Sequence, residues 1–203
     1  MAIEIHEGDL PAGVDFGGAA AVDTETMGLD PARDRLCLVQ LSAGDGEAHL
    51  VRFRERRCDA PNLARLLRDP EVTKIFHFAR FDIAVLERHL AVRAAPVYCT
   101  KIASRIARTY TDRHSLRDLA GELLGVEISK AQQSSDWGAE TLSAAQQSYA
   151  ASDVLHLHAI RAALDRMLER EGRSELARRC FDFVGHRAAL DLAGWRDIDI
   201  FAH

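Results

Sequence analysis

The segment Ala19-Ala20-Ala21-Val22-Asp23-Thr24-Glu25 decides how the rest of this 203-residue chain is interpreted. A short apolar run that ends in acids predicts a buried β-strand whose last residues reach a polar site. Residues 36–42 are nearly continuously apolar, as in a strand that is covered on both faces. Gly44-Asp45-Gly46 then predicts a hairpin turn into a strand over 48–53. Together these segments predict an antiparallel meander.

Beyond residue 60 the pattern alternates between helix and strand. Apolar spacing and turn residues predict strands over 72–78 and 97–99, and helices over 61–68, 81–90, 100–110, 115–124, 143–169 and 174–195. Ser115 and Ser143 are in position to act as N-caps. Neither an internal repeat nor a linker-like stretch interrupts the chain. We therefore expect one α/β domain over 1–203, with a mixed β-sheet flanked by helices.

Length and composition narrow the class of protein. A chain of this length corresponds to about one domain, and its 26 basic and 31 acidic side chains give a net charge of −5. No apolar run approaches the roughly 20 residues that span a membrane, and the first residues do not resemble a secretory signal. The cysteines are widely spaced, which predicts reduced thiols in a cytoplasmic protein without a membrane partner: Cys37, Cys58, Cys99 and Cys180.

An acidic chain is an unusual nucleic-acid binder, unless its acids hold metal cations or its ligand is very short. Asp23 and Glu25 are two residues apart on a strand, so their side chains share a face. Tyr149 and Asp153 share a helix face at i, i+4, and Asp82 follows a predicted strand. Each has an ordinary explanation when taken singly, as a turn residue, a helix-start acid or a half-buried tyrosine. Carboxylates brought this close together repel one another unless a cation lies between them.

Three segments, taken in order, resemble the motifs of the DEDD superfamily of 3′→5′ exonucleases, in the subclass that carries tyrosine: Val22-Asp23-Thr24-Glu25-Thr26-Met27-Gly28-Leu29, His77-Phe78-Ala79-Arg80-Phe81-Asp82 and Tyr149-Ala150-Ala151-Ser152-Asp153. The stretch 115–126, with Lys130 and Ser135-Asp136-Trp137, is similar to the ribonuclease D branch. The resemblance covers about 19–170. His77 stands where many relatives carry asparagine. Only about thirty residues follow, including the helix predicted over 174–195, whereas ribonuclease D carries further helical domains. The chain therefore looks most like the bacterial nano-RNase C group.

This resemblance implies a ribonuclease H-like fold and a site for two divalent ions, Mg²⁺ or Mn²⁺. The implied metal ligands are Asp23, which bridges the ions, with Glu25, Asp82 and Asp153. Tyr149 completes the implied catalytic set by orienting the attacking water, since a phenol of ordinary pKa is a poor base at neutral pH. Other positions are implied to contact substrate, and for several of them a structural role is left open: Thr24, Met27, Gly28, Leu29, Gln40, His77, Arg80, Phe81 and Lys130.

The function implied is that of an exoribonuclease that degrades short single-stranded RNA, dinucleotides included, to nucleoside 5′-monophosphates. Three alternatives stay open: ribonuclease D-like trimming of longer structured RNA such as tRNA, cleavage of DNA, and a catalytically silent nucleic-acid-binding module. A homo-oligomer is also expected, because relatives form rings and the segment 176–195 carries apolar side chains. Zinc and serine hydrolases are disfavoured, since the chain contains neither HExxH nor GxSxG.

Overall fold

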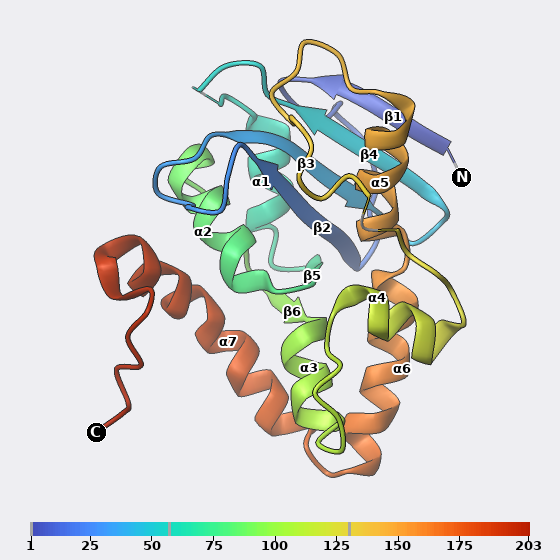
Figure 1. The fold of residues 1–203 in the computed structure, drawn as a ribbon, viewed down its shortest axis with the longest axis vertical. Helices are drawn as coiled ribbons and strands as arrows, with labels where there is room; N and C mark the ends of the chain where they lie inside the picture. The colour runs from blue at the N-terminus through green and yellow to red at the C-terminus, as the bar shows by residue number, and fades with distance from the viewer. Residues whose placement is uncertain (1, 57, 130) are drawn as a thin grey trace.

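The computed structural model describes residues 2–56, 58–129 and 131–203. Within these residues, six strands form one sheet in the order β1-β4-β3-β2-β5-β6 (Figure 1). Their bounds are β1 (Ala2–Glu7), β2 (Ala19–Thr26), β3 (Leu36–Ser42), β4 (Glu47–Arg52), β5 (Thr73–Phe76) and β6 (Val97–Cys99). The predicted meander is confirmed as the antiparallel pairs β2–β3 and β3–β4, and parallel pairing elsewhere makes the sheet mixed.

Strand β1 was not predicted from the sequence. It pairs in parallel with β4 at the sheet edge, and most of its side chains stay exposed or half-buried. Because the strand buries so little, its residues lack the apolar run that identified the inner strands. Its partner lies some 45 positions further along the chain in the paired register. Only the three-dimensional pairing reveals it.

The helices agree with the predicted pattern, with differences at their ends. Their bounds are α1 (Pro61–Arg68), α2 (Ala79–Leu90), α3 (Thr100–Ala107), α4 (Leu116–Leu119), α5 (Ala144–Leu155), α6 (Leu157–Arg170) and α7 (Ser174–Leu190), with π-helical turns η1 (Ala120–Leu124) and η2 (Asp191–Trp195). The prediction of one helix over 143–169 was wrong, because the chain bends at His156 between α5 and α6. Both serine N-caps are confirmed, and Ser143 forms a capping box with Gln146.

Helices cover both faces of the sheet. Helix α5 packs on β3 and β4, where Ala150 joins Leu38 and Leu50 in a small apolar cluster. The larger core lies between the sheet and the remaining helices, and Figure 1 shows α1 on the opposite side of the sheet from α5. None of the described helices is long and apolar enough to cross a membrane. The predicted α/β class is thereby confirmed.

Candidate active site

The carboxyl-terminal end of β2 presents two acids on one face of the sheet. Asp23 lies opposite Gln40 in the antiparallel register with β3, and the Gln40 Nε2 donates a hydrogen bond of 3.2 Å to Asp23 Oδ2. The pairing shifts between Glu25 and Thr26. Irregular strand pairing of this kind is frequent next to active sites, where it changes the direction of a side chain. Strand pairing therefore fixes Asp23, while β2 leaves its regular course just after Glu25.

Asp82 reaches the same place from the first turn of α2. Phe78, the N-cap residue just before this helix, adopts the left-handed conformation, with φ 72° and ψ 42°. For a bulky residue this conformation is strained and is typical of functional sites. Asp82 is only 3 % exposed, and the Thr24 hydroxyl donates a 2.7 Å hydrogen bond to its Oδ1. One residue of β2 thus orients a carboxylate that is 58 positions away.

Helix α5 contributes the remaining acid. Tyr149 and Asp153 lie four residues apart on α5, so their side chains share one face of the helix. Asp23, Glu25 and Asp153 each offer a carboxylate oxygen, and these oxygens lie within 4.8 Å of one another. Two of these acids come from β2 and one from α5. With Asp82 from α2 they form what we call the acid cluster.

The acid cluster is electrostatically costly in the absence of a cation. Burial, followed by the charges of its neighbours, raises the pKa of Asp23 well above its usual range. The same two causes raise the pKa of Glu25 to about 9. Burial raises the pKa of Asp82 and of Asp153 to about 7, against the opposing effect of hydrogen bonds from Thr24 and Tyr149. Four acids that resist ionisation together are stabilised by a positive ion among them.

The donor set fits hard divalent cations. Carboxylate oxygens are the ligands that Mg²⁺ and Mn²⁺ prefer, and the acid cluster offers no sulfur or imidazole donor. The clustered oxygens and their mutual repulsion therefore fit the implied Mg²⁺ or Mn²⁺. Asp23, Glu25 and Asp153 are the residues placed to hold an ion jointly, with Asp82 adjacent.

A cavity of about 730 Å³ opens over the acid cluster. Most of the residues predicted to touch substrate line it: Thr24, Met27, Gly28, Leu29, His77 and Phe81. Leu29 is 79 % exposed at the rim of this cavity. Tyr149 and Trp137 line the opposite part, with ring centroids 6.0 Å apart. Trp137 is buried and packs beside Tyr149.

His77 occupies the cavity as a neutral side chain. Burial and the nearby Lys101 charge lower the pKa of His77 to about 3. Its Nδ1 lies 2.9 Å from the Thr100 hydroxyl, which itself donates to the Phe76 carbonyl. The imidazole must then donate from Nδ1, and this leaves its Nε2 as an acceptor.

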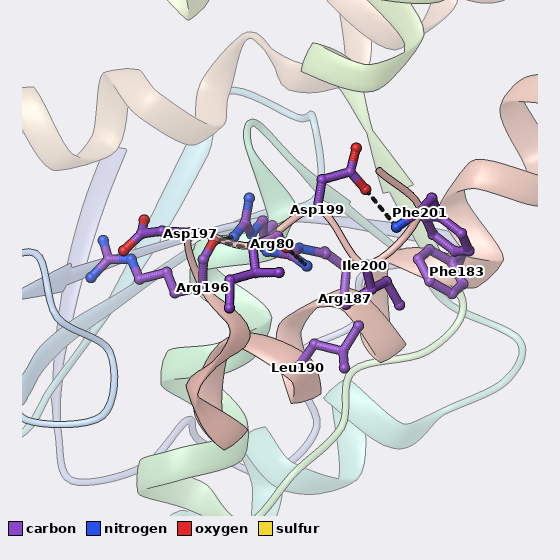
Figure 2. Close-up of a pocket in the computed structure, with 10 residues that line it drawn as sticks. Arg80, Phe183, Arg187, Leu190, Arg196, Asp197, Asp199, Ile200 and Phe201 are labelled. Atoms are coloured by element: carbon purple, nitrogen blue, oxygen red, sulfur yellow. Dashed lines mark hydrogen bonds between the residues drawn. The ribbon is translucent and has the colours of Figure 1, made fainter. Parts of the chain in front are cut away.

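Two residues predicted to touch substrate lie elsewhere. Gln40 is fully buried behind Asp23, and its Oε1 has no partner among the described residues. Arg80 points toward the C-terminal segment (Figure 2), where its Nη2 donates to Asp191 Oδ1 at 2.7 Å. Arg80 is not among the residues that line this cavity, because its side chain pairs with Asp191, 111 positions away. Lys130 lies outside the described residues.

Several cavity residues were missed at the sequence level. Phe78 is exposed by 44 %, with the Lys101 Nζ 4.5 Å from its ring centroid, and Arg117 also lines the cavity. Arg196 reaches the cavity from beyond η2 and donates a 2.8 Å hydrogen bond to the Leu29 carbonyl. The left-handed backbone of Phe78 leaves no trace in sequence. Lys101, Arg117 and Arg196 come from three separate parts of the chain, so their positive charges do not form a recognisable sequence motif.

Comparison with known proteins supports the same picture. Residues 13–169 match a family model described as a 3′-5′ exonuclease. The chain superposes on Brucella melitensis NrnC bound to pGG with TM-score 0.97 and 54 % identity, over 100 % of this chain and 99 % of that one. The same protein with bound Mg²⁺ gives TM-score 0.96 and 53 % identity, over the whole of both chains.

Ribonuclease D proteins are also similar, over part of their length. Escherichia coli RNase D gives TM-score 0.74 and 26 % identity, over 89 % of this chain and 48 % of that one. Ribonuclease D of Gluconacetobacter diazotrophicus is 39 % identical over 153 residues, which are 75 % of this chain and 38 % of the relative. The chain thus spans about two fifths of the curated relatives that it matches. These likenesses confirm the predicted ribonuclease H-like fold.

The raised pKa values predict how the stability of the metal-free protein depends on pH. Between about pH 4 and 9 the folded state binds more protons than the unfolded state, so the free energy of unfolding falls as pH rises. Thermal unfolding in chelator should show Tm decreasing over this range, and Asp23→Asn should flatten the decrease. Asp112→Asn, at an exposed position, is the matched control. A wild-type Tm that rises from pH 6 to 9 contradicts the prediction.

The hydrogen bond from Thr24 to Asp82 leads to a second prediction, which concerns metal affinity. Thr24→Val keeps the side-chain shape but removes the hydrogen bond to Asp82, and loss of such an outer partner typically costs about 10–100-fold in metal affinity or activity. Titration calorimetry with Mg²⁺ measures this loss, and Thr24→Ser, which retains a hydroxyl, should restore most of the affinity. Equal affinities for Thr24→Val and the wild type would show that this bond does not matter.

Proposed function

The chain belongs to the 3′-5′ exonuclease family, and we propose that it is a metal-dependent exoribonuclease acting on short oligoribonucleotides. Its products are nucleoside 5′-monophosphates, and dinucleotides are among its substrates. The observation that carries this proposal is the acid cluster at the floor of a compact cavity. The full-length likeness to a protein solved with pGG supports the short substrate.

The acid cluster supplies the chemistry. Asp23, Glu25, Asp82 and Asp153 would hold two divalent ions, which would supply activation of water and stabilisation of the leaving oxygen. The four acids fix where the ions would lie, and their side chains offer oxygen ligands only. Burial and the neighbouring carboxylates raise the pKa of Tyr149, so its phenol stays protonated at neutral pH. Tyr149 therefore orients the attacking water through a hydrogen bond and does not abstract its proton.

The cavity suits a ligand of a few nucleotides. Its volume lies within the range of about 300–1,000 Å³ that is typical of small-molecule sites, whereas a long single strand needs an extended basic groove. Phe78 offers an aromatic ring for base stacking, which is sequence-tolerant, and Leu29 offers apolar surface. Lys101 and Arg117 place positive charge where phosphates enter. These contacts let a chain of net charge −5 bind an anion.

Trimming of longer RNA is the second candidate function. It is favoured by the 39 % identity to a Ribonuclease D, while this chain covers only part of that protein. DNA cleavage stays an alternative, because phosphodiester hydrolysis by two metals does not itself require the 2′-hydroxyl. A catalytically silent binding module is disfavoured by the presence of all four acids and Tyr149. We place the reaction in the cytoplasm, consistent with four free cysteines.

Substrate length separates these functions. We expect 5′-labelled RNAs of about two, three, seven and twenty nucleotides to release monophosphate in Mg²⁺, the dinucleotide fastest, and to stay intact in chelator. Fast shortening of the longest RNA with the dinucleotide left over would support trimming, and intact RNA and DNA in Mg²⁺ and Mn²⁺ would refute an enzyme. Asp23→Ala should lower turnover by about 10³-fold, since metal contacts are worth several kcal/mol, whereas Asp112→Asn should not.

A homo-oligomer is part of the proposal. The last part of the chain exposes large apolar side chains: Leu176, Phe183, Trp195, Ile198, Ile200 and Phe201. Several of them gather near Arg187 (Figure 2), and clustered exposed apolar residues mark protein contacts. Sedimentation at micromolar concentration should show an assembly larger than a monomer, and Phe201→Ser with Ile198→Ser should shift it toward monomer. A monomeric wild type would remove this part of the proposal.

A further inference from the structure

Strand pairing places three potential metal ligands at the sheet edge, away from the acid cluster. Glu4 and His6 are two residues apart on β1 and share a face of the sheet. His49 of β4 lies opposite Glu4 in the parallel register. Figure 1 shows β1 beside β4 at the outer edge. The fold therefore brings two imidazoles and a carboxylate together although His49 is 43 positions beyond His6.

The donor atoms are spaced like the corners of a metal site. His6 Nε2 lies 3.1 Å from His49 Nδ1, Glu4 Oε2 lies 3.5 Å from His49 Nδ1, and Glu4 Oε2 lies 3.8 Å from His6 Nε2. Zinc bonds to nitrogen and oxygen are about 2.0–2.2 Å long, so tetrahedral ligand atoms stand about 3.3–3.5 Å apart. The triangle needs only small side-chain adjustments to hold one ion.

Burial gives the three ligands an inner and an outer side. The side chains of His6 and His49 are 12 % and 11 % exposed, while that of Glu4 is 57 % exposed. The edge of Phe16 packs against the His49 ring at 5.8 Å between centroids. The imidazoles are thus held in place by packing, and the carboxylate side stays open to ions and water.

We propose that Glu4, His6 and His49 form a second metal site, for Zn²⁺ or a similar late transition ion, with water as the fourth ligand. Two imidazoles and one carboxylate are a recognised zinc ligand set, and the set differs in kind from the oxygen ligands of the acid cluster. The nitrogen-to-nitrogen hydrogen bond requires a proton on one facing nitrogen. On binding, that proton leaves the facing nitrogen, either for the far nitrogen of the same ring or for solvent.

The proposed ion stabilises the sheet edge. Among the strands that the structure describes, β1 pairs only with β4, and an edge strand with exposed side chains is easily lost from a sheet. An ion shared by Glu4 and His6 of β1 and His49 of β4 joins the two strands through side chains as well as backbone. Because it binds the folded chain, it raises Tm by mass action.

Visible absorption with Co²⁺ tests the site. The full chain, purified without a histidine tag and stripped with chelator, is titrated with Co²⁺ in excess Mg²⁺. We expect one equivalent to give the intense bands of four-coordinate Co²⁺, which six oxygen ligands do not give, and Zn²⁺ to displace them. Asp23→Asn should leave the bands unchanged. Failure of intense bands to form in the wild type overturns the proposal, whatever the nuclease activity is.

Variants assign the ligands. His6→Gln and His49→Gln should each weaken Co²⁺ binding by more than about 10-fold, because they remove a direct ligand, and should abolish the Tm increase given by Zn²⁺. His186→Gln, at an exposed position on α7, is the matched control. Should His49→Gln fail to fold, Glu4→Gln at the exposed corner provides the same test. Bands of unchanged intensity in His6→Gln and Glu4→Gln would show that the ion binds elsewhere.

Discussion

Mutual repulsion among four carboxylates is the constraint on which the rest of this structure depends. Burial and the neighbouring charges both oppose ionisation at Asp23 and Glu25, so the fold maintains a site that is least favourable when it is empty and fully charged. A protein tolerates such a site only where the surrounding scaffold is firmly built. Here β2 lies inside the sheet between β3 and β5, and the core around Val22 is completely buried.

The scaffold controls the acids through uncharged partners. Gln40 of β3 donates a hydrogen bond to Asp23 of β2. Thr24, next to Asp23 on β2, donates a hydrogen bond to Asp82. Neither partner brings a positive charge, so neither competes with a cation for the carboxylates. Amide and hydroxyl donors orient the acids while leaving their charge to be balanced by an ion. The chain thereby keeps affinity for divalent metal while holding its ligands in fixed directions.

The parts of the site that could be predicted from sequence are those governed by local geometry. The pairs Asp23 with Glu25, and Tyr149 with Asp153, are defined by strand and helix periods, and their segments were assigned correctly. Asp82 needed the family resemblance, since an acid after a strand is common. Gln40 and Arg80 lie outside the cavity lining, which sequence could not show: Gln40 meets Asp23 through the strand register, and the Arg80 partner Asp191 is 111 positions away. Strand β1 was not predicted for the same reason, because it is defined by its pairing with β4 and not by an apolar run.

The hydrogen bond from Arg196 to the Leu29 carbonyl joins segments 167 positions apart. Leu29 stands at the rim of the active-site cavity, and Arg196 follows the turn at Gly194, where φ is 101°. The rim is therefore built from two segments, the β2–β3 loop and the residues that follow α7. A tag fused after residue 203, or a neighbouring subunit packed on this end, would therefore act on the cavity rim while leaving the four acids in place. The C-terminal segment therefore supports the rim of the cavity through the hydrogen bond from Arg196 to Leu29.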